Sequence, residues 1–421
     1  MLTTYDLLDI VFLGLVGAAG LVVLWWPTRR GTVPGWLDRR ADELRHYVGD
    51  WRILALVAAI IYVGVTTYDL EAGLYGCAQA AGPSDALAYY ASGREFLTGG
   101  DPFEVANCGG TVSIPYGMSV VLVNALGSLA GLPGVVLVWG AVAVATLPLT
   151  AWVAGDDRRY VVLVVATSLL FLPLAVSQID GASNLLVPVV VLLALGLARR
   201  RGVLAGVVGG LLASGRFPSL FPTVGASGRF SRPYVSGFVA IAAFAAVTGA
   251  TYLAYGRAFL DTVFTGEIGR RSFSLNLYGV LIQQGWLPSG DLVAAIQALL
   301  TVALVAVVFV RARTAVGGAA ITLTGVVLLS QFLSFNILAW ILPVALLGTR
   351  PRWWLWGVGA LGTLNYTIGY SWAAVDLGIW WPYEVMDVAL TILLLGLFVD
   401  AWRADQAAAR PVRTAPGATT S

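Results

Sequence analysis

Long apolar runs, separated by short polar stretches, make up most of this chain. Many of the runs approach or exceed the roughly 20 residues that a helix needs to cross a hydrocarbon core of about 30 Å. The pattern therefore predicts an all-α polytopic membrane protein. The runs lie at residues 5–26, 53–68, 116–131, 134–154, 160–176, 184–198, 203–222, 234–255, 289–310, 315–330, 337–348, 353–371 and 384–402.

Composition supports lipid as the main solvent of the chain. Hydrophobic residues make up 58% of the 421 residues and charged residues only 11%, and the mean hydropathy is +0.82. A soluble domain of this size could not bury so much apolar surface. These values exclude an ordinary water-soluble enzyme.

The placement of arginine predicts the orientation. All 25 basic residues are arginine, and basic residues gather on the cytoplasmic side of membrane spans. Placing the clusters inside requires an odd number of crossings between residue 115 and Arg158, and an even number between Arg201 and Arg229. The clusters are Arg29–Arg52, Arg158–Arg159, Arg199–Arg201, Arg229–Arg232, Arg311–Arg313, Arg350–Arg352 and the tail arginines Arg403, Arg410 and Arg413.

Two of the apolar runs are therefore not expected to cross. The run 116–131 is only about 24 Å of helix, which is short for the hydrocarbon core. The run 203–222 contains Gly215, Pro218 and Pro222 and is typical of a re-entrant hairpin. About 11 transmembrane helices remain, with two re-entrant or interfacial segments, the N-terminus outside and the C-terminus inside.

Three regions follow from this topology. Residues 1–52 form an extra transmembrane helix and an arginine-rich cytoplasmic loop. Because the run 5–26 has no basic region before it and no small-residue cleavage site, we expect a retained span and not a signal peptide. Residues 53–402 form the membrane domain, and residues 403–421, rich in Ala, Pro and Thr, are expected to be a disordered cytoplasmic tail.

The largest outer loop, residues 69–115, concentrates polar residues. Its stretch SDALAYYASGREFLTGGDPFE begins at Ser84 and carries acids, an arginine and an aromatic pair. Cys77 and Cys108 also lie in this loop. A disulfide between them would close a loop of about 30 residues and contribute roughly 3–4 kcal/mol; two free thiols are the alternative.

Several kinds of catalytic site are excluded by residue type. The one histidine, His46, is in a predicted inner loop, so a Ser-His-Asp or Cys-His site outside is excluded. No phosphate-binding glycine motif joins a strand to a helix. Carboxylates and arginines at a lipid interface remain, a combination that suits deprotonation of a hydroxyl while a phosphate leaves.

The motifs of the outer loops resemble those of the GT-C glycosyltransferases, in particular the polyprenyl-phosphate-mannose-dependent family called GT87. The first loop has Asp85, then Tyr89–Tyr90, then the Gly100–Phe103 turn, then Pro115–Tyr116. Further along the chain are SQIDGASNLL with Gln178, ASGRFP with Arg216 in place of a lysine, SLNLYG with Asn276, and SFNILAW with Asn336 where histidine is common. The resemblance covers roughly residues 53–400.

The resemblance implies an inverting transfer of a hexose, such as mannose, from a polyprenyl- or dolichyl-phosphate donor. The acceptor would be a lipid-linked or surface glycan on the extracytoplasmic side of the plasma membrane. Asp85 would be the general base. The structural alternative is that Asp85, with Ser84, caps the helix of the loop.

The remaining candidates would bind substrate. Arg270 and Arg271 could hold the donor phosphate or contact lipid headgroups. Gln178, Asp180 and Asn184 could bind sugar hydroxyls or cap their loop. Tyr89, Asn276 and Asn336 complete the set, although Tyr89, Tyr90 and Phe96 could instead lay the loop helix on the membrane surface.

No cofactor is implied, although convergence of Asp85, Asp101 and Asp180 would permit a divalent metal. Asp101 is first of all a turn residue. The expected partners are membrane lipid, a polyprenyl-phosphate-linked sugar and a glycan or glycolipid acceptor, without nucleic acid. Two other functions stay open: a transporter or flippase for a polar lipid, and an inactive scaffold of the same fold.

Overall fold

The computed structural model describes residues 85–107, 110–154, 185–265, 281, 285–286, 291–330, 335–348, 353–365 and 378–408. Helices dominate these residues, as the apolar runs predict. The elements are α4 (Asp85–Thr98), β1 (Glu104–Asn107), β2 (Gly110–Ser113), α5 (Met118–Ser128), α6 (Gly131–Ala154), α9 (Leu186–Ala198), α10 (Gly202–Ala213), η2 (Phe217–Ser219), α11 (Leu220–Ser227), α12 (Pro233–Leu260), η3 (Asp261–Thr265), α15 (Asp291–Arg311), α16 (Ala315–Leu329), α17 (Phe335–Gly348), α18 (Trp353–Leu364) and α19 (Trp381–Ala408).

The described part of the chain is a helical membrane protein. Three of its helices are long and apolar enough to cross a bilayer: α6, the Pro233–Arg257 part of α12, and α19. Several others are apolar but shorter. Large apolar side chains on α12 are strongly exposed, with Tyr234 at 78%, Phe238 at 71% and Leu253 at 86%. A continuous apolar helix surface of this kind is suited to lipid and not to water.

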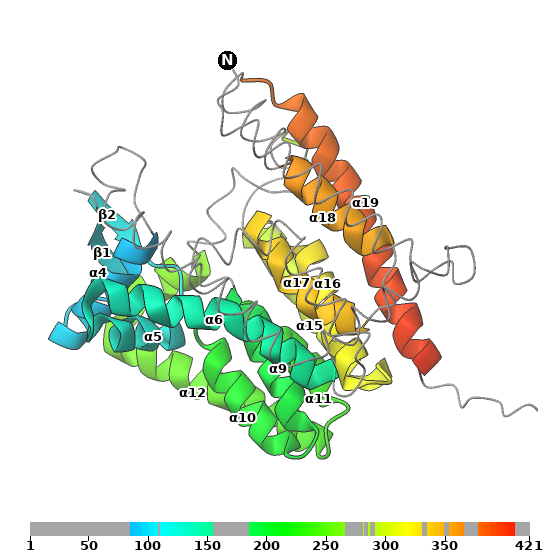
Figure 1. The fold of residues 1–421 in the computed structure, drawn as a ribbon, viewed down its shortest axis with the longest axis horizontal. Helices are drawn as coiled ribbons and strands as arrows, with labels where there is room; N and C mark the ends of the chain where they lie inside the picture. Colours follow the sequence, from blue (N-terminus) through cyan, green and yellow to red (C-terminus); the bar gives the residue numbers. More distant parts are fainter. Residues whose placement is uncertain are drawn as a thin grey trace, which may run out of the picture.

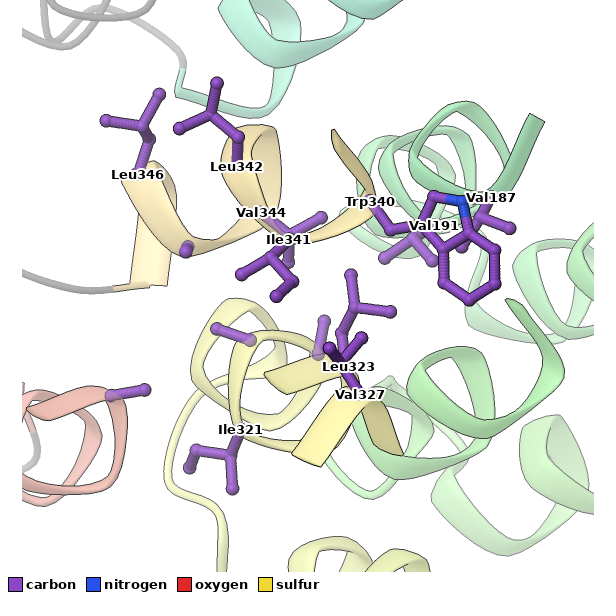
Figure 2. Packing of buried hydrophobic residues seen from close by; sticks show 14 of the residues in the cluster. Val187, Val191, Ile321, Leu323, Val327, Trp340, Ile341, Leu342, Val344 and Leu346 are labelled. Carbon is purple, nitrogen blue, oxygen red and sulfur yellow. The ribbon is translucent and has the colours of Figure 1, made fainter. Parts of the chain in front are cut away.

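Helices that are close in the sequence pack against one another, and a hydrophobic core joins these groups of helices (Figure 1). The blue and cyan end of the molecule holds α4, α5 and the two strands, while α10 lies between α9 and α12. The orange and red pair, α18 and α19, joins the rest through α16 and α17. Figure 2 shows the core around α16 and α17, where Val187 and Val191 of α9 lie beside Trp340 of α17.

The contact between α10 and α12 is unusually close because glycine residues lie in it. A Cβ at Gly206 would overlap the backbone of Ser236, and one at Gly210 would overlap the carbonyl oxygen of Ala240. Both glycines lie one turn apart on the face of α10 that packs on α12. The glycine-rich sequence of α10 therefore brings the two helix backbones together.

The two runs that were expected not to cross form short or broken helices. Helix α5 has 11 residues, about 16 Å of helix, which is less than the hydrocarbon core. The run 203–222 is interrupted after Ala213, and η2 and α11 continue it from Phe217. The interruption lies at Gly215 and Pro218, as the helix-breaking residues predict.

Arginines from two separate clusters close the ends of neighbouring helices. Arg199 donates to the carbonyl oxygens of Trp152, at 3.0 Å, and of Val153 in the last turn of α6. Arg229 donates to those of Val310, at 3.0 Å, and of Ala312 at the end of α15. A guanidinium there satisfies carbonyls that have no partner within their own helix and complements the helix dipole.

The end of α19 corrects the prediction of a disordered tail from residue 403. The helix continues to Ala408, and Asp405 is buried at 2% exposure. Its carboxylate accepts hydrogen bonds from the backbone N–H groups of Arg313, at 2.7 Å, and Thr314, at 2.8 Å. Asp405 thus caps α16 from a neighbouring helix, in addition to the N-cap residue Thr314, whose hydroxyl accepts a hydrogen bond from the Gly317 N–H. Local composition does not reveal such a partner. Residues 409–421 lie outside the described part.

A β-hairpin also departs from the all-α prediction. Strands β1 and β2 are antiparallel, with Val105 opposite Val112. Val105 is buried against Ala88 of α4 and Ile114, so the hairpin lies against the loop helix. Four-residue strands are too short to give a clear alternating pattern in the sequence.

Candidate functional site

The loop helix α4 begins at Asp85, the predicted general base. The helix packs closely on α5. A Cβ atom added at Gly93 would overlap the backbone of Asn124. The Ser128 hydroxyl also donates to the carbonyl oxygen of Tyr90 at 3.2 Å. Asp85 therefore lies in the first turn of a well-anchored helix. A carboxylate in the first turn of a helix is favoured by the helix dipole.

Tyr89, one turn after Asp85, lies inside the protein. Its side chain is 2% exposed, and its ring centroid lies 5.9 Å from that of Tyr116 and 5.4 Å from that of Trp139. The expectation that Tyr89 rests on the membrane surface is wrong, because α5 and α6 cover it. The sequence suggested Tyr89 as a substrate contact, whereas in this structure it is a core residue.

Arg216 lies at the break between α10 and η2 and is buried at 6% exposure. Its guanidinium carbon is 3.9 Å from the centroid of the Tyr116 ring. A desolvated cation over an aromatic face is stabilised by about 2 kcal/mol. The resemblance identified Arg216 as a motif match but not as a site residue. The signal was an arginine in an apolar run, between two helix-breaking residues.

Backbone contacts fix Tyr116 and Arg216 together. The Gly117 N–H donates to the carbonyl oxygen of Gly215 at 2.9 Å. The hydroxyls of Ser119 and Ser214 lie 2.6 Å apart. A Cβ at Gly117 would overlap the Ser214 carbonyl oxygen, so a larger residue could not make this approach. The IPYG motif of the outer loop and the SGRFP break thus form one unit.

Buried hydrogen-bond donors surround this unit. The Trp139 indole N–H donates to Asn124 Oδ1 at 2.8 Å. The Asn124 Nδ2 group and the Ser92 hydroxyl are buried and have no hydrogen-bond partner among the described residues. We call Tyr89, Tyr116, Asn124, Trp139 and Arg216 the Tyr116 cluster.

The Tyr116 cluster links the helix that begins at Asp85 with a buried cation. Asp85 precedes Tyr89 by one helical turn, a rise of about 6 Å along α4. Tyr89 contacts Tyr116, and Tyr116 lies against Arg216. A guanidinium can hold a phosphate through two parallel hydrogen bonds, and a partly desolvated carboxylate can accept a proton. The arrangement suits a reaction in which a phosphate leaves and a hydroxyl loses its proton.

Asp101 has the turn role that the sequence predicts. Its Oδ1 accepts a hydrogen bond from the Phe103 N–H at 2.9 Å. The bend directs Phe103, which is fully buried, against Tyr255 and Phe259. Within the described ranges, no three His, Cys, Asp or Glu side chains meet in a metal-binding group. Asp180, the third acid considered for a metal, lies outside those ranges.

Most of the other predicted site residues also lie outside the described residues. Asn336 is in the first turn of α17, but its side chain is not among those described. The residues whose placement stays a prediction are Gln178, Asp180, Asn184, Arg270, Arg271 and Asn276, with the disulfide candidates Cys77 and Cys108.

No protein-family model, no curated protein and no solved structure matches this chain.

Proposed function

We propose that this protein is an integral-membrane glycosyltransferase of the GT-C type. It transfers a hexose, such as mannose, from a polyprenyl- or dolichyl-phosphate donor to a lipid-linked or surface glycan. The observation that carries the proposal is the contact between the two motifs at Tyr116. Through it, the helix that begins at Asp85 and the buried Arg216 belong to one cluster.

In the proposed reaction, the acceptor hydroxyl is the nucleophile. Asp85 takes its proton as the acceptor oxygen attacks the anomeric carbon of the sugar. The bond between that carbon and the phosphate oxygen breaks, and the lipid phosphate leaves with inversion at the anomeric carbon. Arg216 offsets the negative charge that grows on the phosphate, with Arg270 and Arg271 as further candidates.

The proposed topology has about 11 crossings in the plasma membrane, with the active site on the extracytoplasmic side. Two features support it. Helix α5 is too short to cross, and the α10–η2–α11 segment is broken near its centre, as a re-entrant hairpin requires. The tip of that hairpin contacts the outer loop, which is where the donor phosphate would lie.

Replacing the proposed base tests the function directly. The assay is transfer of labelled mannose from polyprenyl-phosphate-mannose in membranes, at matched protein levels. We expect Asp85→Asn to abolish transfer, because the amide cannot accept the proton. Glu95→Gln is the matched control, since Glu95 is an exposed acid on the same helix, and it should keep wild-type activity.

The outcomes separate the parts of the proposal. Equal activity of Asp85→Asn and the wild type would remove Asp85 as the base. Loss of activity in both variants would point to damage of the loop helix instead of the chemistry. No transfer by the wild type from several polyprenyl-phosphate sugars would contradict the enzyme class.

Transport of a polar lipid is the second candidate function. Two ionisable side chains that are buried among apolar helices favour this function: Arg216 at 6% exposure and Asp387 at 0%. Such residues often mark substrate or proton pathways in membrane proteins. Scrambling of a fluorescent polyprenyl phosphate in liposomes, without any acceptor, would distinguish this function from sugar transfer. An inactive scaffold would show neither activity.

A further inference from the structure

Asp387 is an acid buried inside a candidate membrane span. It lies on α19, about 9 Å along the helix from Trp381. Trp380 and Trp381 are 42% and 66% exposed, as expected for aromatic residues at a membrane interface. Asp387 itself has no exposed surface. It is therefore a carboxyl group enclosed by protein within a candidate membrane span.

Asn365 is the hydrogen-bond partner of Asp387. Its amide Nδ2 donates to Asp387 Oδ1, and its side chain is also fully buried. The other two oxygens of the pair, Asp387 Oδ2 and Asn365 Oδ1, accept no hydrogen bond from the described part of the chain. Buried oxygens normally have a donor, and these two oxygens have none among the described residues.

Among the described residues, the helices packed against α19 supply no positive charge to this acid. These are α16, α17 and α18, and their sequences Ala315–Leu329, Phe335–Gly348 and Trp353–Leu364 contain no charged residue. The nearest titratable neighbours on α19 are Tyr383 and Glu384. Glu384 adds negative charge, which disfavours a second carboxylate. A buried carboxylate without a nearby cation is strongly unfavourable and is relieved by taking up a proton.

We propose that Asp387 and Asn365 form a binding site for one proton within the helix bundle. The proton comes from water and bonds to Oδ2, which turns the carboxylate into a neutral acid and supplies the missing donor. A single proton needs one oxygen, whereas a metal ion needs several. The pair itself offers one carboxylate and one amide, and no group of three His, Cys, Asp or Glu side chains occurs in the described residues.

This site is separate from the proposed transferase chemistry. Asp387 is on α19, which packs on α16, α17 and α18, whereas the Tyr116 cluster is built by α4, α5, α6 and the break before η2. Release of the proton would place a negative charge between α18 and α19. The proton therefore gives these two helices a pH-dependent contact, whichever reaction the protein performs.

Infrared spectroscopy of the purified full-length protein in lipid nanodiscs tests this proposal without a sugar substrate. A buried protonated aspartate gives a carboxylic-acid C=O band that shifts on ¹³C labelling of aspartate and on transfer to deuterated water. We expect this band at neutral pH in the wild type and its loss in Asp387→Asn. Asp261→Asn, which changes an acid with 55% side-chain exposure, should leave the band unchanged.

Each result bears on the proton site alone. Absence of the band from the wild type at neutral pH would overturn it, as would a band that persists in Asp387→Asn. Should Asp387→Asn fail to fold, Asn365→Ala provides a second measurement, because loss of the amide donor is expected to shift the band of the same acid. A band that disappears when sodium replaces choline in the buffer would show a cation site and overturn the proton.

Discussion

Arg216 and Tyr89 show how little of the site a single residue reveals in the sequence. Arg216 stands out because it interrupts an apolar run, but its position over Tyr116 depends on a contact between segments about 100 residues apart. Tyr89 looks like a surface aromatic from its neighbours alone. Trp139, which covers it, belongs to another helix. Residue type indicated both positions, whereas only packing decides what each side chain contacts.

Replacing Arg216 with lysine keeps the positive charge and removes the planar guanidinium group. We expect Arg216→Lys to reduce sugar transfer, because an ammonium group cannot make two parallel hydrogen bonds or stack on Tyr116 as a guanidinium does. A lost charged hydrogen bond of about 1.5–3 kcal/mol would slow transfer roughly ten- to hundredfold. Initial rates against donor concentration measure this loss. Arg257→Lys, at an arginine with 88% side-chain exposure, is the control, and an equal loss in both would contradict a specific role.

At the scale of elements, apolar runs predicted the helices well and their ends less well. The run 134–154 became α6, Gly131–Ala154, and the run 384–402 became α19, Trp381–Ala408. Helix α19 is longer because its last turn has a tertiary partner: Asp405 caps α16. A periodicity argument cannot find such a partner. The same holds for the short strands β1 and β2, whose burial depends on α4.

Two truncations test this end of α19. A chain that ends at Ala408 keeps Asp405 and should unfold within about a degree of the full chain. A chain that ends at Arg403 loses the cap of α16, and we expect it to lose about 1–2 kcal/mol, seen as a lower midpoint in thermal unfolding. Asp405→Ala should reproduce most of that loss. Equal midpoints for both truncations would mean that Asp405 contributes nothing measurable.

In the whole molecule, arginine side chains donate hydrogen bonds to carbonyl oxygens at the ends of helices from different parts of the chain. The Arg199 and Arg229 guanidinium groups close α6 and α15. A Cβ at Gly202 would crowd Ser231, so the segments that carry these arginines are adjacent. Charge placement alone leads us to expect both clusters on the same side of the membrane. It could not predict the meeting of the Tyr116 and Arg216 segments, which needs the folded chain.

Cysteine labelling tests the proposed topology, in which Arg232, just before α12, and Glu95, on α4, face opposite sides of the membrane. In a background with Cys77→Ser and Cys108→Ser, we expect Arg232→Cys to react with a membrane-impermeant thiol reagent only after cells are opened. Glu95→Cys, on the exposed side of α4, should react in intact cells. Reaction of both positions from the same side would contradict the proposed topology.

The hydrogen bond between Gly117 and Gly215 also means that a displacement of the Tyr116 segment would be transmitted to the broken hairpin. One end of α11 follows the segment that carries Arg216, and the other end leads into Arg229, which holds the end of α15. With only 8 residues, α11 is about 12 Å long and stiff. A molecule that pushes Tyr116 aside would therefore pull, through α11, on the end of α15 that Arg229 contacts.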